Sequence, residues 1–350
     1  METDTLSEVL RAVRLRGAIF FDVRATSPWM EESPEGAEIA SPALDGAPHV
    51  ISFHAVAEGA CWVEVEGHPP VRLEQGDIIV LPQGDAHVLG SAPGLKDPAD
   101  ITAHVEAARR GPLPVPVSGG GGGPERVRLV CGFLGCERVP FNPLLAALPR
   151  VVVVRDGEHG ARSLLPLVRL ALQESGERRS GGHAVLARLS ELLFLEAIRR
   201  HVEELPAEHA GWLAGLRDPH VGRALAALHA RPAAAWTLAA LAREAGLSRS
   251  ALAERFAAFV GQPPMQYLLR WRLQLAAGLL MEGAKVAAAA EEVGYDSEAA
   301  FSRAFKRLAG VPPSGWKERQ AAAAREACRA GAERAPRQER RPPVRATSSA

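Results

Sequence analysis

The sequence predicts a mixed α+β protein: an N-terminal β-barrel or jelly roll, followed by an all-α part with two helix-turn-helix units. Two observations support this prediction. Short β-type runs separated by glycine and proline fill much of residues 1–140. Near the C-terminal end, one helical pattern occurs twice with the same spacing. The chain of 350 residues is long enough for two domains, each with its own core.

The N-terminal part begins with a short amphipathic helix over residues 5–15, in which leucine and valine fall on one side. After Gly17 the sequence changes to short runs rich in β-branched and aromatic residues. Many short strands with frequent turns are typical of a β-barrel or jelly roll. The predicted strands cover residues 18–23, 50–56, 61–65, 71–73, 78–81 and 127–133.

A flexible loop over about residues 92–126 is expected to interrupt the barrel, because its glycine, proline and alanine cannot bury a core. From Asn142 onward the pattern is helical, with helices predicted over 142–147, 161–174 and 183–205. The last of these helices is apolar on more than one side and therefore needs two partners. Either it covers the barrel and also forms a homodimer with a second subunit, or it is buried wholly inside one chain.

The duplicated helical pattern spans Leu238–Gly246 and Val286–Gly294. In the first copy Thr237 is the expected N-cap, and Gly246 supplies the left-handed backbone that ends the helix. Ser248 is the expected cap of the helix that follows. This order of helix, tight turn and second helix predicts a helix-turn-helix.

The second copy repeats the arrangement. Its turn contains Tyr295, and either Asp296 or Ser297 caps the next helix. In both units, residues four apart place two large apolar side chains on the inward face. These pairs are Leu252 and Phe256 in the first unit, and Phe301 and Phe305 in the second.

A single helix, Pro264–Met281, is predicted to link the two units. About 17 residues with a rise of roughly 1.5 Å each give a rod of some 25 Å, which holds the units about one DNA turn apart. Residues 1–216 carry 20 basic and 29 acidic side chains, whereas residues 217–350 carry 21 and 12. The C-terminal part therefore has the positive sign needed to replace counterions on a phosphate backbone.

No apolar run approaches the roughly 20 residues that span a bilayer, and the N-terminus lacks a hydrophobic signal core. The sequence therefore predicts a cytoplasmic protein without a membrane partner. Its 4 cysteines are too few for a disulfide scaffold and are expected to be thiols. Cys131 and Cys136 form a candidate redox pair if a turn at Gly132 or Gly135 brings their Cα atoms within about 7 Å. Otherwise both are small buried residues.

The C-terminal segment, roughly residues 217–319, resembles the AraC/XylS family of transcriptional regulators. The resemblance rests on GQPPMQYLLRWRLQLA, on EEVGYDSEAAFSRAFKR and on the closing GVPPSGW. It implies a regulator that binds double-stranded DNA sequence-specifically and also contacts RNA polymerase. Residues 320–350 lack periodicity and are expected to be a disordered tail.

The second helix of each unit enters the major groove in such proteins, with the outward residues of its first turns near base edges. We therefore expect two sets of DNA-binding residues. These are Arg249, Ser250, Ala253 and Glu254 in the first unit, and Glu298, Ala299, Ser302, Arg303 and Lys306 in the second. Arg270 and Arg272, on the linking helix, are expected either to touch phosphate or to anchor that helix.

In the barrel, Gly76, Pro82, Gly84 and His87 fit the spacing G-x5-P-x-G-x2-H, which resembles the second motif of cupins. Roughly residues 5–150 resemble the cupin-type sensor domain of some AraC-like regulators, and we expect a sensing domain over 1–140 and a helical connector over 141–210. The resemblance implies a jelly roll and a pocket for a small-molecule effector. His54 lies on the strand where cupins carry their first motif, and we expect His54 and His87 to line this pocket.

The first cupin motif is degraded, because Val56 stands where a second histidine would be and no carboxylate follows at the required position. Two imidazoles make a poor metal site, so we expect no metal, no cofactor and no catalytic residue. The alternative is a cupin-type metalloenzyme, a dioxygenase or isomerase, fused to a DNA-binding domain. It is disfavoured by the incomplete ligand set.

Overall fold

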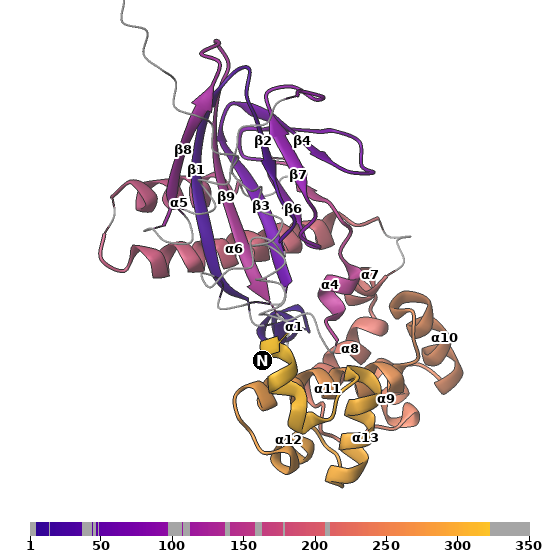
Figure 1. Ribbon diagram of the computed structural model, residues 1–350. Coiled ribbons are helices and arrows are strands. Elements are labelled where there is room, and N and C mark those ends of the chain that lie inside the picture. Colours follow the sequence, from indigo (N-terminus) through magenta and orange to yellow (C-terminus); the bar gives the residue numbers. More distant parts are fainter. Residues whose placement is uncertain are drawn as a thin grey trace, which may run out of the picture.

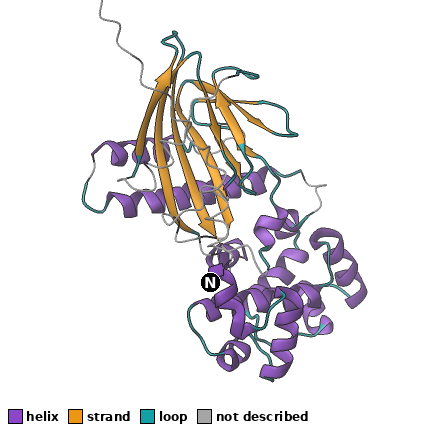
Figure 2. Ribbon diagram, viewed as in Figure 1, coloured by secondary structure: helices purple, strands orange, loops and turns teal. Residues whose placement is uncertain are grey.

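The computed structural model describes residues 5–13, 15–36, 44, 47, 49–96, 107, 113–136, 141–157, 163–177, 179–206 and 211–322. A barrel of two sheets forms the N-terminal part, and a cluster of helices forms the C-terminal part (Figures 1 and 2). The predicted α+β class is therefore confirmed. None of the described helices is long and apolar enough to cross a membrane.

The larger sheet has six strands in the order β10-β6-β3-β9-β1-β8. The smaller sheet has four strands in the order β2-β7-β4-β5. All neighbouring strands are antiparallel except β1 and β8. The strands are β1 Arg16–Thr26, β2 Met30–Ser33, β3 His49–Glu58, β4 Ala60–Val65, β5 Val71–Glu74, β6 Ile78–Leu81, β7 His87–Gly90, β8 Val115–Gly120, β9 Arg126–Cys136 and β10 Val152–Val154.

Side chains of the larger sheet alternate between two apolar cores. On β3, Ile51 and Phe53 belong to the outer core, which α5 (Leu165–Glu177) and α6 (Gly182–Glu204) cover. Their neighbour Val56 belongs to the inner core between the two sheets. Because strand side chains alternate with period two, His54 shares the inner face with Val56.

The predicted flexible loop at residues 92–126 is wrong for the part that contains the glycines. Residues 115–120 form β8, which pairs in parallel with β1. The glycines that follow pack on the end of β1: the N–H of Gly121 donates to Thr26 O (3.1 Å), and that of Gly123 to Ser27 O (2.7 Å). A Cβ at Gly123 would lie 2.3 Å from Ser27 O, so glycine here allows close backbone approach. Residues 97–106 and 108–112 lie outside the described residues.

The helical part begins earlier than residue 217. Its elements are α7 Trp212–Arg217, α8 Val221–Ala230, α9 Leu238–Ala245, α10 Arg249–Val260, α11 Pro264–Met281, α12 Val286–Glu292, α13 Glu298–Ala309 and the 3-10 turn η3 Pro313–Gly315. The indole N–H of Trp212 on α7 donates to the hydroxyl of Tyr267 on α11 (2.9 Å). Residues 316–322 are helical, and the remainder of the predicted tail, 323–350, lies outside the described residues.

The predicted helix boundaries of both units are confirmed. The Thr237 side chain caps α9 by accepting from the N–H of Ala240 (3.1 Å). Gly246 ends the helix with φ +70°. Of the two alternatives for the second unit, Ser297 is the cap of α13. The linking helix α11 has the bounds expected, and it contributes to two cores: Tyr267 packs in the core of the first unit, and Leu273 in that of the second.

The barrel and the first helix-turn-helix unit share one continuous core. The short helix α1 (Thr5–Val13) packs against α8, and its Val9 is fully buried. Phe141, just before α4 (Pro143–Ala147), donates its backbone N–H to Gln274 Oε1 on α11 (2.8 Å). The guanidinium of Arg270 lies over the Phe141 ring at 4.2 Å. The sensor-like part therefore contacts the linking helix itself.

Arg272 fastens α11 to both units. Its guanidinium donates to three backbone carbonyls: Pro232 (2.7 Å) and Ala234 (2.8 Å), before α9, and Gly294 (3.2 Å), in the second turn. Gly294 has φ +80°, and a Cβ there would lie 2.4 Å from Ala233 O. The two units therefore meet across α11, and the charged group fixes their separation.

Replacing Arg272 with Met should lower the free energy of unfolding by about 2–4 kcal/mol, because three carbonyls lose a charged donor. Chemical denaturation of the full chain measures the loss. Arg243→Met, at an exposed position on α9, is the control and should change stability by about 0.5 kcal/mol or less. Equal losses in both variants would show that the carbonyl contacts contribute nothing.

Candidate DNA interface and barrel interior

The two helices that follow the turns, α10 and α13, are built alike. Each begins at a serine cap, with Ser248 Oγ accepting from Ala251 N and Ser297 Oγ from Ala300 N, both at 3.2 Å. The predicted inward pairs, Leu252 with Phe256 and Phe301 with Phe305, are all 0% exposed. The opposite face of each helix is therefore the one that remains accessible.

On α13 the predicted DNA-facing residues lie at the surface. Glu298, Ala299, Arg303 and Lys306 are exposed, and Ser302 is half-buried. Within the described part of the chain, the side chains of Arg303 and Lys306 form no hydrogen bond or ion pair. Both cations are free to meet a phosphate or a base edge.

On α10 the corresponding set is less basic. Arg249, Ser250 and Glu254 are exposed, and Ala253 is half-buried. Arg255, which the sequence analysis did not single out, is held in an ion pair with Asp218. Among the described residues, the unpaired charges of α10 are therefore one arginine and one glutamate.

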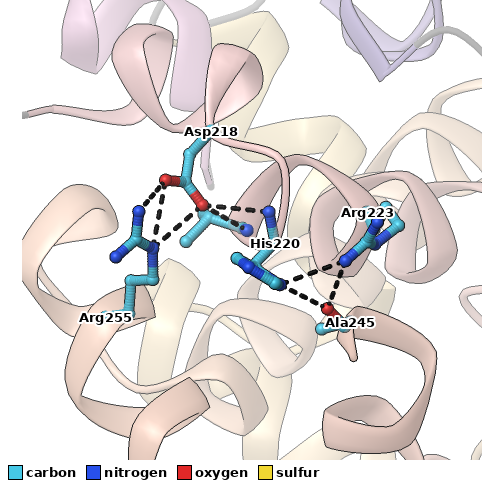
Figure 3. A network of polar contacts seen from close by, with 6 residues as sticks. Asp218, His220, Arg223, Ala245 and Arg255 are labelled. Carbon is cyan, nitrogen blue, oxygen red and sulfur yellow. Dashed lines mark hydrogen bonds and ion pairs between the residues drawn. The ribbon is translucent and has the colours of Figure 1, made fainter. Parts of the chain in front are cut away.

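A polar network fixes α10 to the corner between α7 and α8 (Figure 3). Asp218 accepts two bonds from Arg255 Nε (3.0 and 3.1 Å) and caps α8 by accepting from Val221 N (2.8 Å). Burial alone would raise the pKa of Asp218, but these donors outweigh it and lower that pKa. Beside this pair, Arg223 Nη2 donates to Ala245 O, at the end of α9 (2.8 Å). The corner thus holds both helices of the first unit.

The two arginines of α11 are held by contacts within the protein. Arg270 Nη1 donates to Gln262 Oε1 (3.2 Å), its guanidinium stacks on Phe141, and burial lowers its pKa. Arg272 donates to three carbonyls, as described above. Of the two alternatives from the sequence, the contacts favour helix anchoring.

His54 and His87 meet inside the barrel. Their Nε2 atoms lie 2.6 Å apart, and His87 Nδ1 donates to Asp85 O (2.8 Å). With Nδ1 protonated, His87 Nε2 is an acceptor, so His54 Nε2 carries the shared hydrogen. Burial lowers the pKa of His87 to about 4 and holds that of His54 well below its usual value. Both rings are therefore neutral near pH 7.

Two further polar groups share this interior. Ser52 Oγ and His54 Nδ1 are buried without a hydrogen-bond partner among the described residues. Glu31, on β2, lies opposite Leu89 and so shares the inner face. Burial raises the pKa of Glu31 to about 7. Glu31 could not be recognised from the sequence, because residues 30–33 carry no β-branched residue that would signal a strand.

Comparison with known proteins finds relatives for both parts of the chain. A family model described as "Cupin" matches residues 4–203, and one described as "Helix-turn-helix domain" matches residues 241–319. A putative AraC-like transcription regulator of Streptomyces lividans is 38% identical over 274 residues, 78% of this chain and 88% of the relative. A similarly named protein of Streptomyces antibioticus is 35% identical over 317 residues, 90% of this chain and 98% of the relative. The chain belongs to the AraC family of transcriptional regulators.

Among solved structures, the crystal structure of a DNA-binding transcriptional dual regulator from Escherichia coli K-12 is 29% identical. It covers 29% of this chain and 90% of its own, with a TM-score of 0.27. The family membership rests on the sequence relatives and family models. It confirms the expectation of a DNA-binding transcriptional regulator with a cupin-type N-terminal part and a helix-turn-helix C-terminal part.

The barrel of this AraC-family regulator does not fit a cupin metal. No group of three or more His, Cys, Asp or Glu that could hold an ion occurs in the described ranges. The two histidines that the motif supplies are hydrogen-bonded to each other, so the Nε2 lone pair of His87 is already used. A catalytic metal usually needs three protein ligands.

The two cysteines of β9 cannot form the predicted redox pair. Cys131 and Cys136 lie on one continuous strand, and neither Gly132 nor Gly135 turns it back. Five residues of strand span about 16 Å, far beyond disulfide reach. Cys131 faces the inner core and Cys136 the outer core, and burial raises the pKa of Cys131 well above its usual value. The structure therefore agrees with the alternative of two small buried residues.

The neutral histidines should make the protein less stable in mild acid. The pKa of His87 is about 4 in the folded chain and about 6.5 for an ordinary imidazole, so the unfolded chain binds this proton first as the pH falls. Stability from this group is present above pH 6.5 and is lost between 6.5 and 4. Glu31 has the opposite effect on stability: because its pKa is raised in the folded chain, its contribution to the free energy of unfolding increases as the pH falls.

Between pH 7 and pH 5, His87→Gln should therefore reduce the loss of unfolding free energy by up to about 2 kcal/mol relative to the unsubstituted chain. Urea denaturation at the two pH values measures this difference. His68→Gln, at an exposed histidine, is the matched control and should leave the pH dependence unchanged. An unchanged pH dependence in His87→Gln would mean that His87 binds its proton equally well in the folded and the unfolded chain.

Proposed function

We propose that this regulator reads two successive major grooves with α10 and α13, and that a small molecule bound inside the barrel controls this binding. The proposal rests on one observation: two helices with serine caps, α10 and α13, are held by the single helix α11. The 18 residues of α11 give a rod of roughly 27 Å, close to one turn of DNA. The second unit adds the unpaired cations Arg303 and Lys306.

For the first unit we propose DNA contacts from Arg249, Ser250, Ala253 and Glu254. For the second we propose contacts from Glu298, Ala299, Ser302, Arg303 and Lys306. An arginine can form a bidentate bond to guanine, and a glutamate can accept from cytosine. The lysine acts as a point charge towards phosphate. The reading unit in this proposal starts at α7, because Trp212 packs into its core.

The effector site of the proposal is the inner face of the barrel. Ser52 Oγ and His54 Nδ1 have no hydrogen-bond partner there among the described residues, and an unpaired buried polar group is costly unless something binds it. His54 pairs in register with Cys131 on β9. The chain that leaves β9 reaches Phe141, which contacts Arg270 and Gln274 on α11. A ligand that shifts β3 against β9 would therefore act on the helix that spaces the two reading units.

We further propose a homodimer that forms through α6, and contact between the DNA-bound regulator and RNA polymerase. Leu192 and Val185 on α6 and Leu170 on α5 are large apolar side chains with 38–42% exposure, which a second subunit would cover. We place the regulator in the cytoplasm, with the DNA that it binds. The relatives are transcription regulators, and we propose no enzymatic activity for the barrel.

Arg303→Ala should weaken binding to the preferred duplex by about 1–3 kcal/mol and relax the preference at one base position. The preferred duplex is obtained by sequencing the genomic fragments that the full-length protein retains at physiological salt. Arg307→Ala, on the same helix but facing α11, is the matched control and should keep the base preference. A uniform loss on every sequence would reassign Arg303 to phosphate, and the absence of any preferred sequence would refute the proposed readout.

Glu31→Gln should abolish the response to effector while leaving the affinity for DNA within about twofold, because Glu31 lies in the barrel and far from α10 and α13 in the fold. Metabolites related to the genes beside the retained fragments serve as candidate effectors in a DNA-binding titration. Glu32→Gln changes the next residue on β2, which is exposed, and should respond normally. If both variants respond like the unsubstituted protein, the effector does not bind at this face.

A further inference from the structure

The two recognition helices are anchored to their units by different sets of buried side chains. On α13 the buried residues are Phe301, Phe305 and Ala304. On α10 they are Leu252 and Phe256, the counterparts of the two phenylalanines. Residues four apart lie along one line of a helix, and contacts along a single line resist a roll of the helix about its own axis poorly. The apolar contacts therefore fix the orientation of α10 less firmly than that of α13.

Arg255 has on α10 the place that Ala304 has on α13, one residue before the second large anchor. Successive residues are about 100° apart around a helix, so Arg255 lies beside the line of Leu252 and Phe256, between the buried face and the outward face. Its guanidinium is held by Asp218, at the corner between α7 and α8 (Figure 3). The third anchor of α10 is therefore polar, whereas that of α13 is apolar.

Asp218 is itself fixed, so it can act as a reference point for α10. Its side chain is 5% exposed, and Oδ1 accepts from the backbone N–H groups of His220 (3.0 Å) and Val221 (2.8 Å), at the start of α8. The residue before it, Arg217, donates to Leu205 O (2.6 Å), at the end of α6. The corner is thereby fastened to α8 and to the helix that covers the barrel.

The contact between Asp218 and Arg255 has a defined geometry. Nε lies 3.1 Å from Oδ1 and 3.0 Å from Oδ2, and Nη2 also donates to Oδ2. A guanidinium that holds both carboxylate oxygens constrains direction as well as distance. The Arg255 side chain is 46% exposed, and an ion pair open to solvent contributes little to stability. The main consequence of the pair is therefore for the orientation of α10.

We propose that Asp218 is a positioning residue: through Arg255 it sets the rotation of α10 about its axis, and with it the base preference of the first reading unit. This inference rests on the proposed readout of DNA by α10. A roll of about 20° moves an atom about 6 Å from the helix axis by roughly 2 Å, which exceeds the tolerance of a hydrogen bond. After such a roll, Arg249 and Glu254 distinguish the bases that they meet less well.

Base discrimination in each half of the preferred duplex tests this role. The duplex is the one that the full-length protein retains from genomic fragments, and each position is substituted in turn. Discrimination is the ratio of the affinity for the preferred duplex to that for the substituted one. Positions where it falls in Arg249→Ala or Glu254→Ala belong to the first unit, and positions where it falls in Arg303→Ala belong to the second.

Asp218→Asn keeps an oxygen for the N–H groups at the start of α8, since asparagine is an equally good cap, but it removes the charge that holds Arg255. It should lower discrimination at least fivefold in the first half and less than twofold in the second. Arg255→Gln changes a half-exposed side chain, so it should fold normally and show the same effect. The double variant should lose no more than either single variant.

Glu244→Gln is the matched control. Glu244 forms an ion pair with Arg231 in the same unit, but this pair joins α9 to the end of α8 and leaves α10 alone. Discrimination in both halves should stay within twofold of the unsubstituted protein. A loss in the first half as large as that in Arg255→Gln would show that any broken ion pair of this unit has the effect.

Three other results would overturn the proposal. Equal losses in both halves in Arg255→Gln would mean that the pair only stabilises the fold, and unchanged discrimination would mean that it has no effect on readout. Additive losses in the double variant would mean that Arg255 contacts DNA independently of Asp218. A protein without any preferred duplex refutes the proposed readout itself, whereas a preferred duplex that Asp218→Asn reads equally well refutes only the positioning role.

Discussion

The constraint on which the rest of the structure depends is that one helix, α11, must belong to two cores at once. Its first half packs through Tyr267 and Trp271 with α7 and α8, and its second half packs through Leu273 and Leu280 with α12 and α13. In the proposed DNA-bound geometry, this rod keeps the two recognition helices at a fixed separation. Arg272 adds a charged clamp at the middle, where the two cores separate.

The same helix also receives the barrel. Because Phe141 bonds to Gln274 and stacks under Arg270, the end of the barrel part touches α11 rather than a free linker. The core that runs from the outer face of the larger sheet to α10 is continuous. Packed interiors resist gradual deformation. We therefore expect a conformational change in the barrel to reach α10 as a switch between two packings of this core, or not to reach it at all. The contacts of α1 with α8 place a second connection on the same unit.

Features that depend on neighbouring residues could be predicted from the sequence, and features that depend on distant partners could not. The caps Thr237 and Ser248 and the bounds of α11 follow from local spacing and were found correctly. In the sequence, the glycines near Gly121 indicate only conformational freedom. In the structure they allow the backbone to pack closely against the end of β1, a strand that is distant in the sequence. In the same way, Arg272 looks like any exposed helical cation until the carbonyls that it binds are in place.

The two recognition helices are similar in shape but unequal in charge. Arg255 on α10 is held in an ion pair with Asp218. The unpaired charges of α10 in the described structure are therefore those of Arg249 and Glu254. On α13, Arg303 and Lys306 are unpaired in the described structure, and the helix carries one acidic residue, Glu298, in its first turn. The electrostatic part of DNA binding grows with the number of phosphates that are neutralised. In the proposed geometry, the second unit therefore supplies most of the attraction. The first unit is fixed to the α7–α8 corner and shares its core with the barrel part, so we expect a change in the barrel to act on this unit.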